Sequence, residues 1–256
     1  MNGVLNAVFP ALNALDDAMA TVMPAWLRLV VFGILSGAVS MGLYSLLSNQ
    51  EGIKAQKAKL QDIQRQLKAA GDDLALTMSL SRQNLSIAFG LLGRSAVPAI
   101  LSSLPIVFII AWLAVHWGYQ APPEGTPVPV TLAPADVPVA VEPAGLLSGQ
   151  GADLALQWPA PTTTLQILSG GTSLWTGTAE ALASTGEVGR PRWYSSILGN
   201  PAGYLPADGP LDTFSVALPE QELLGFGPWW VRTWWFVYFL TVVIVSLAVK
   251  FIFKID

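Results

Sequence analysis

The feature that most constrains this chain is its C-terminal run from Phe226 onward, FGPWWVRTWWFVYFLTVVIVSLAVKFIFKID. No charged residue interrupts it between Phe236 and Val249. Tryptophans gather at its beginning, and indole rings are stable at the headgroup level of a bilayer. About 20 helical residues cover a hydrocarbon core of about 30 Å. The run therefore predicts a membrane-spanning helix, residues 227–251, with interface anchors at Trp229, Trp230, Arg232, Trp234 and Trp235.

Two earlier segments are also long and apolar enough to span. Residues 25–47 carry one charge, Arg28, near their start, and residues 97–119 end in an aromatic stretch that contains His116. Charged residues make up 12% of the chain, against about 25% in a typical soluble domain. We therefore expect an integral membrane protein with three spans, at residues 24–48, 96–119 and 227–251.

The first 23 residues have a different pattern. Apolar side chains recur there at spacings of three and four, which predicts an amphipathic helix lying in the membrane interface. A poorly ordered tail is the alternative. Pro10 and the Asp16–Asp17 pair interrupt any signal-peptide core, so no cleavable signal is expected.

The distribution of charge predicts the orientation of the spans. Lys and Arg outnumber acids in residues 49–95, and Lys250 and Lys254 follow the last span. Between residues 120 and 225 the only basic residues are Arg190 and Arg192, among many acids. By the positive-inside rule the 49–95 loop and the tail, residues 252–256, are cytoplasmic, and the N-terminus and the acidic loop lie outside. An acidic outer loop favours a bacterial inner membrane.

Residues 49–95 predict a helical hairpin that projects into the cytoplasm. Heptad spacing of Ile and Leu is interrupted at AAGDD, residues 69–73, and then resumes in a second register. Gly71 favours the end of one helix, and the aspartates that follow it favour the start of the next. The basic residues of the hairpin form a solvated face, or they contact anionic lipid or the ribosome.

Residues 120–226 predict a β-rich domain outside the membrane. A proline-punctuated stretch is followed by short alternating runs with turn signals between them: DLALQWP, TTLQILSG, SLWTGTAE, RWYSSILG and DTFSVALP. Strands at this spacing are typical of a small β-sandwich. We expect this domain to dock an extracytoplasmic protein partner.

The composition argues against catalysis. The chain has no cysteine and one histidine, so metal sites and His-based triads have almost no ligands or bases to use. We expect no cofactor, no metal, no specific nucleic-acid site and no enzymatic activity.

Polar residues inside the spans are the candidate functional residues. Gly33 and Gly37 form a small-xxx-small pair that predicts close helix packing. Ser36 and Ser40 lie on one helical face and either pack or line a hydrated groove, with Ser102 and Ser103 in the second span. Arg28 is either an interfacial anchor or a groove charge.

The order of these parts resembles the short, three-helix branch of the YidC/Oxa superfamily of membrane-protein insertases. That branch includes archaeal homologues and the insertase-type subunit of the endoplasmic-reticulum membrane complex. The resemblance rests on an arginine near the outer end of the first span and on a basic cytoplasmic hairpin. A proline-bearing span, LSSLPIVFIIAWLAVHWGY, and a last span introduced by GPWWVRTWWFVYFL complete it. It covers residues 20–120 and 226–254, and the long outer domain departs from it.

The resemblance implies a mechanism without covalent chemistry. The three spans would enclose a groove, open to the cytoplasm and to lipid, that hydrates and thins the bilayer for a client segment. Arg28 would attract acidic client segments, and Ser36, Ser40, Ser102 and Ser103 would line the groove. The hairpin would capture membrane-protein clients or contact the ribosome. The alternative is a structural or assembly subunit of a larger inner-membrane complex, with the spans packed against neighbouring subunits.

Overall fold

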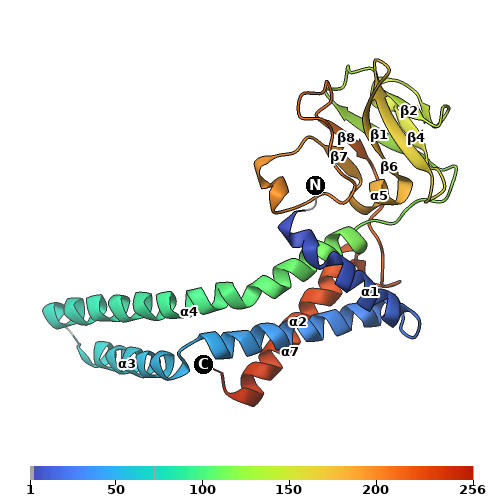
Figure 1. Cartoon of the computed structure of the whole chain (residues 1–256). Coiled ribbons are helices and arrows are strands. Elements are labelled where there is room, and N and C mark those ends of the chain that lie inside the picture. Colours follow the sequence, from blue (N-terminus) through green and yellow to red (C-terminus); the bar gives the residue numbers. More distant parts are fainter. Residues whose placement is uncertain (1–2, 72, 256) are drawn as a thin grey trace. The chain divides into compact units, whose positions relative to one another are not determined.

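The structure, a computed structural model, describes residues 3–71 and 73–255 (Figure 1). The chain divides into two compact units. One contains the N-terminal residues up to Leu29 together with Phe108–Val237, and the other contains Val30–Val107 together with the residues from Tyr238 onward. Each unit is described separately below.

Three helices of the described residues are long and apolar enough to cross a membrane: α2 (Ala25–Leu47), α4 (Leu74–His116) and α7 (Trp234–Phe253). This confirms a helical, multi-pass membrane protein. The last span differs in detail from the prediction, because a short helix, α6 (Trp229–Arg232), precedes it. Thr233 separates α6 from α7 with extended backbone, and its hydroxyl donates to the carbonyl of Trp230 at 2.9 Å.

Residues 49–95 form α3 (Gln50–Ala69) and the first half of α4. Asn49 begins α3, since its side-chain oxygen accepts from the amide of Gly52 at 2.8 Å. At the turn Gly71 has φ +55°, and Asp73 accepts from the amide of Leu76 at 3.0 Å. These bonds satisfy amides that a helix N-terminus leaves unpaired. Asp72, the other aspartate of the turn, lies outside the described residues.

Helix α4 continues without a break from the hairpin into the second span. Its 43 residues include Pro98 and Pro105. At a rise of about 1.5 Å per residue it is about 65 Å long, roughly twice a hydrocarbon core. Arg94 is the last charged side chain before the apolar stretch, and the residues of α4 before it are called the arm of α4.

The N-terminal segment is helical, as the apolar spacing predicts. A 3₁₀ turn, η1 (Val4–Val8), leads into α1 (Phe9–Ala20). Pro10 is accommodated because it lies in the first turn of α1, where a missing N–H breaks no helical hydrogen bond.

Residues 120–226 contain two antiparallel sheets, which confirms a separate β-rich domain. The larger sheet has the strand order β3-β4-β1-β8-β7 and the smaller one β2-β5-β6. The strand bounds are β1 Pro127–Ala133, β2 Ala140–Glu142, β3 Leu147–Ser148, β4 Ala155–Gln157, β5 Thr164–Ser169, β6 Thr172–Thr178, β7 Glu187–Gly189 and β8 Thr213–Val216.

The core of this domain is built from alternate residues of the strands and from one helix. Leu156, Val188 and Phe214 are completely buried, each on a strand of the larger sheet. Leu182 of α5 (Ala179–Thr185) joins the same core. Trp175 of β6 is buried as well, and its indole N–H donates to the carbonyl of Ala202 at 2.6 Å. The indole therefore ties a loop to the sheet while filling the core.

One predicted strand is wrong. The run RWYSSILG forms a 3₁₀ turn, η3 (Trp193–Ser196), rather than a strand. Ser195 accepts from the amide of Arg192 at 2.8 Å, and the amides of Ile197 and Leu198 both donate to the carbonyl of Tyr194. A serine side chain that bonds the local backbone competes with sheet pairing, so alternation of residue type is not sufficient here.

Candidate functional site

Arg28 is held by a buried carboxylate from the N-terminal helix. Its guanidinium donates to Oδ2 of Asp16, on α1. The same carboxylate oxygen lies 3.0 Å from Nε2 of His116, at the end of α4. The Asp16 side chain is 2% exposed and that of Arg28 15%. Three helices thus meet at one carboxylate, which we call the Asp16 cluster: Asp16, Arg28 and His116.

Aromatic rings enclose the Asp16 cluster. Cζ of Arg28 lies 4.7 Å from the ring centroid of Trp117, within the range of a cation–π contact. Trp112 stacks on His116 with ring centroids 4.9 Å apart, and its indole N–H donates to Oδ1 of Asn13 at 2.6 Å. The Asp16 and Arg28 side chains are largely removed from water, so their charges depend on each other for stabilisation, whereas the His116 side chain is 34% exposed.

Three polar atoms in and beside the Asp16 cluster lack a hydrogen-bond partner within the described residues. Asp16 Oδ1, Arg28 Nε and Trp117 Nε1 are buried without a hydrogen-bond partner there. Arg28 was predicted as a groove charge or an interfacial anchor, and the structure places it in an ion pair. Its positive charge is therefore paired within the chain.

The small face of α2 packs against α7. A Cβ added to Gly33 would lie 2.7 Å from Cβ of Thr241, and one added to Gly37 would lie 3.1 Å from Cβ of Val245. Between them Ser36 is buried, donating to the carbonyl of Phe32 at 2.7 Å and accepting from the hydroxyl of Tyr238 at 2.9 Å. Because glycine has no side chain, α2 and α7 can approach each other closely here, as helices do at other small-xxx-small pairs.

The other predicted groove residues lie at different levels of burial. Ser40 is half-buried on α2, one turn beyond Ser36. Ser102 is buried and Ser103 half-buried on α4, and each donates to the carbonyl three residues back, at 3.0 Å and 2.8 Å. Their hydroxyl protons are thus already engaged. A groove lined by these serines stays a prediction.

The predicted interface anchors lie at the start of the last span. Trp229, Trp230 and Trp235 are exposed and Trp234 is half-buried. Arg232 does not point freely outward, since its Nη1 lies 3.2 Å from Oε2 of Glu222 and its Nε donates to the carbonyl of Gly227 at 2.8 Å. These contacts fold the chain before the span back on itself.

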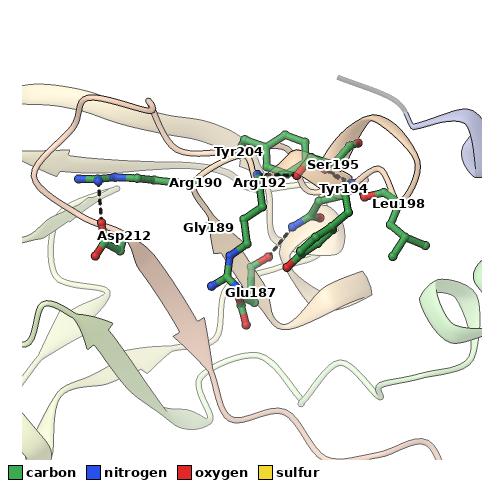
Figure 2. Close-up of a pocket in the computed structure, with 10 residues that line it drawn as sticks. Glu187, Gly189, Arg190, Arg192, Tyr194, Ser195, Leu198, Tyr204 and Asp212 are labelled. Atoms are coloured by element: carbon green, nitrogen blue, oxygen red, sulfur yellow. Dashed lines mark hydrogen bonds and ion pairs between the residues drawn. The ribbon is translucent and has the colours of Figure 1, made fainter.

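The outer domain contains a polar pocket of about 620 Å³ beside β7 and η3 (Figure 2). Arg190 pairs with Asp212 at 2.8 Å on one side of the view, and Tyr194 and Leu198 lie on the other. Arg190 also donates to the carbonyls of Gly209 and Leu211. Arg192 and Glu187 contribute one further charge of each sign. The pocket thus offers hydrogen-bonding groups of both charges.

The described residues contain no group of three or more His, Asp or Glu that would hold a metal ion. A scan of protein-family models and searches of curated proteins and of solved structures found no match for this chain. The interpretation of the site therefore depends on its own geometry. Sequence reasoning missed Asp16 as a site residue, and the one available signal was a carboxylate on the apolar side of an amphipathic helix.

Proposed function

We propose that this chain is an insertase-like membrane protein, a membrane-protein insertase or membrane chaperone, that receives apolar client segments beside the cytoplasmic hairpin. The observation that carries the proposal is the exposed apolar surface on the arm of α4. Leu85, Phe89 and Leu92 are exposed by 56%, 68% and 63%. They follow one another at spacings of three and four, so they share one helical face. A contiguous apolar face of this kind marks a binding surface or a membrane contact.

The arm continues directly into the second span, which gives a captured segment a path into the bilayer. A charged residue at the bilayer centre costs between about 3 and more than 10 kcal/mol, and local water and thinning lower that barrier. Ser40, Ser102 and Ser103 are the residues expected to keep water near the spans. The Asp16–Arg28 pair would then act as a latch at the outer end, releasing positive charge only when it opens.

The second candidate is a structural or assembly subunit of a larger inner-membrane complex. The packing of α7 into the small face of α2 argues against an open groove on that face, because the face is filled from within the chain. Only 11% of the apolar window of α7 is buried inside the protein, so its remaining surface contacts lipid or a neighbouring subunit. Both candidate functions use the same fold. They differ in whether the exposed apolar faces of the helices bind transient client segments or pack against fixed subunits.

The proposal includes a location and an orientation. The chain is assigned to a bacterial inner membrane with its N-terminus and β-domain outside and its hairpin and C-terminus in the cytoplasm, on the charge distribution. The two sheets are assigned to a sandwich-like module for docking an outer partner. The basic residues of α3, such as Lys59, are the candidate contact with the ribosome.

Photo-crosslinking in living cells tests the proposal. A photoreactive amino acid replaces Phe89 on the arm, Ser40 on α2, and Gln64 on α3 as the control, since Gln64 is exposed, polar and uncharged. An insertase gives short-lived adducts to many newly made membrane proteins at Phe89 and Ser40, and few at Gln64. A single stable adduct to one protein at both sites would instead identify an assembly subunit.

A further inference from the structure

The outer domain, residues 120–226, carries most of its exposed large apolar side chains and all of its basic charge on one short stretch. Among its described residues, the exposed large hydrophobic side chains are Trp193, Ile197 and Leu198, together with Phe226 at the end of the domain next to α6. The only basic residues of the domain are Arg190 and Arg192. These two arginines with Trp193, Ile197 and Leu198, which we call the outer patch, adjoin one another in sequence although the rest of the domain is acidic.

Hydrogen bonds within the loop hold the outer patch in a fixed, exposed conformation. Trp193 is 86% exposed at the start of η3. The hydroxyl of Ser195 accepts a hydrogen bond from the amide of Arg192, and the hydroxyl of Tyr204 accepts one from the amide of Asn200 at 2.8 Å. Both bonds stabilise the turn. A large aromatic side chain that stays exposed gives up the stabilisation that burial of its ring would provide. An exposed apolar patch of this kind indicates that another surface covers it.

The outer patch lies beside the segment that leads to the membrane. The amide of Leu5 donates to the carbonyl of Ile197 at 3.1 Å, and the side chain of Asn6 donates to the carbonyl of Gly199 at 3.2 Å. Gly3 packs on the same loop so closely that a Cβ there would meet the carbonyl of Ile197 at 2.6 Å. The N-terminal backbone and the patch therefore form one surface.

That surface is tied to the outer ends of two spans. Helix α1 begins directly after η1, and its Asp16 binds Arg28 of α2 and lies against His116 of α4. From Asn6 to Asp16 the helical path is about 15 Å at about 1.5 Å per residue. One headgroup region is only about 5–8 Å deep, so this path cannot run straight out of the membrane within it. The apolar spacing of α1 predicts a helix that lies along the interface, and in that orientation the outer patch lies at or near the level of the lipid headgroups.

We propose that the outer patch is a membrane-contact loop that seats the β-domain on the outer leaflet. Trp193, Ile197 and Leu198 enter the headgroup region, and the exposed guanidinium of Arg192 meets lipid phosphates. Tryptophan and arginine are the side chains that such interfaces favour, since one has an amphipathic ring and the other binds phosphate through several donors. The proposal is independent of whether the spans act as an insertase.

The chain contains no cysteine, so a single engineered cysteine reports one position in the full-length protein. Ile197→Cys carries a spin label on the outer patch and leaves Trp193 intact, and Ser173→Cys carries it on an exposed site of β6 as the matched control. Both proteins are placed in lipid nanodiscs. Collision rates with dissolved oxygen and with a water-soluble nickel chelate then report the depth of each label.

The expected result is a nickel-chelate accessibility several-fold lower at position 197 than at position 173. Trp193→Ser in the Ile197→Cys background should raise that accessibility toward the control value. Anionic nanodiscs should lower it relative to zwitterionic ones, and Arg192→Gln should remove that lipid dependence.

Equal accessibility at the two positions in both lipid compositions would overturn the proposal and leave the patch for a protein partner. Unchanged circular dichroism of each variant shows that the fold is intact. If Ile197→Cys alone perturbs the fold, Leu198→Cys, also exposed, replaces it as the reporter with the same two outcomes.

Discussion

Replacing Asp16 with asparagine should destabilise the unit that contains the start of α2 and the end of α4. The carboxylate is 2% exposed and pairs with an arginine side chain that is 15% exposed, so the charge left on Arg28 cannot regain water. Removing one partner of a buried ion pair typically destabilises by about 3–5 kcal/mol. The cation–π contact of Arg28 with Trp117 remains and offsets part of this, so the lower end, about 3 kcal/mol, is expected.

The assay is thermal unfolding of the full chain in nanodiscs, followed by intrinsic tryptophan fluorescence. A chain of this size shifts its Tm by about 2–4 °C per kcal/mol, so a fall of about 6–12 °C is expected. Asp17→Asn is the control, because Asp17 neighbours Asp16 but is exposed. Arg28→Gln combined with Asp16→Asn should recover part of the loss, since no uncompensated charge then remains. Equal Tm values for the Asp16 and Asp17 variants would refute the reasoning.

Two further predictions concern packing and use the same assay. Gly33→Ala should destabilise by about 1–3 kcal/mol, because the new Cβ would lie 2.7 Å from Cβ of Thr241, whereas Gly42→Ala, which meets nothing within 4 Å, should be close to neutral. A neutral Gly33→Ala would show that α7 does not pack on this face. Phe214→Ala should destabilise the outer domain by about 3–5 kcal/mol, since the ring is fully buried between the strands, and an unchanged Tm would contradict that core.

The local elements of this protein could be predicted from the sequence because their causes are local. An apolar run of sufficient length specifies a span by hydropathy alone, and α2 and the membrane half of α4 follow the predicted runs closely, whereas α7 begins at Trp234 rather than at residue 227. The hairpin turn was also predictable, since Gly71 adopts a positive φ and Asp73 caps the next helix. The strand predicted at RWYSSILG failed because a serine hydroxyl bonds the backbone there, which residue alternation does not encode.

The candidate site was less predictable. The spacing of Gly33 and Gly37 predicts close helix packing. It does not predict which helix packs there, and in the structure that helix is α7, through Thr241 and Val245. Likewise the exposed Trp193 could not be distinguished in sequence from a core aromatic of a strand, since exposure depends on how the whole domain closes.

By itself, the sequence determined the spans, the arm, the turn and the location of most strands, since each depends on residues adjacent in the chain. The tertiary structure alone decided the environment of Arg28. Its partner Asp16 is 12 residues away, and the His116 that shares that carboxylate lies 100 residues from Asp16. In the sequence, a charge within an apolar run is interpreted as an anchor or a functional group, because its counter-charge cannot be identified. Its burial and its pairing depend on how three helices pack together, which no single segment specifies.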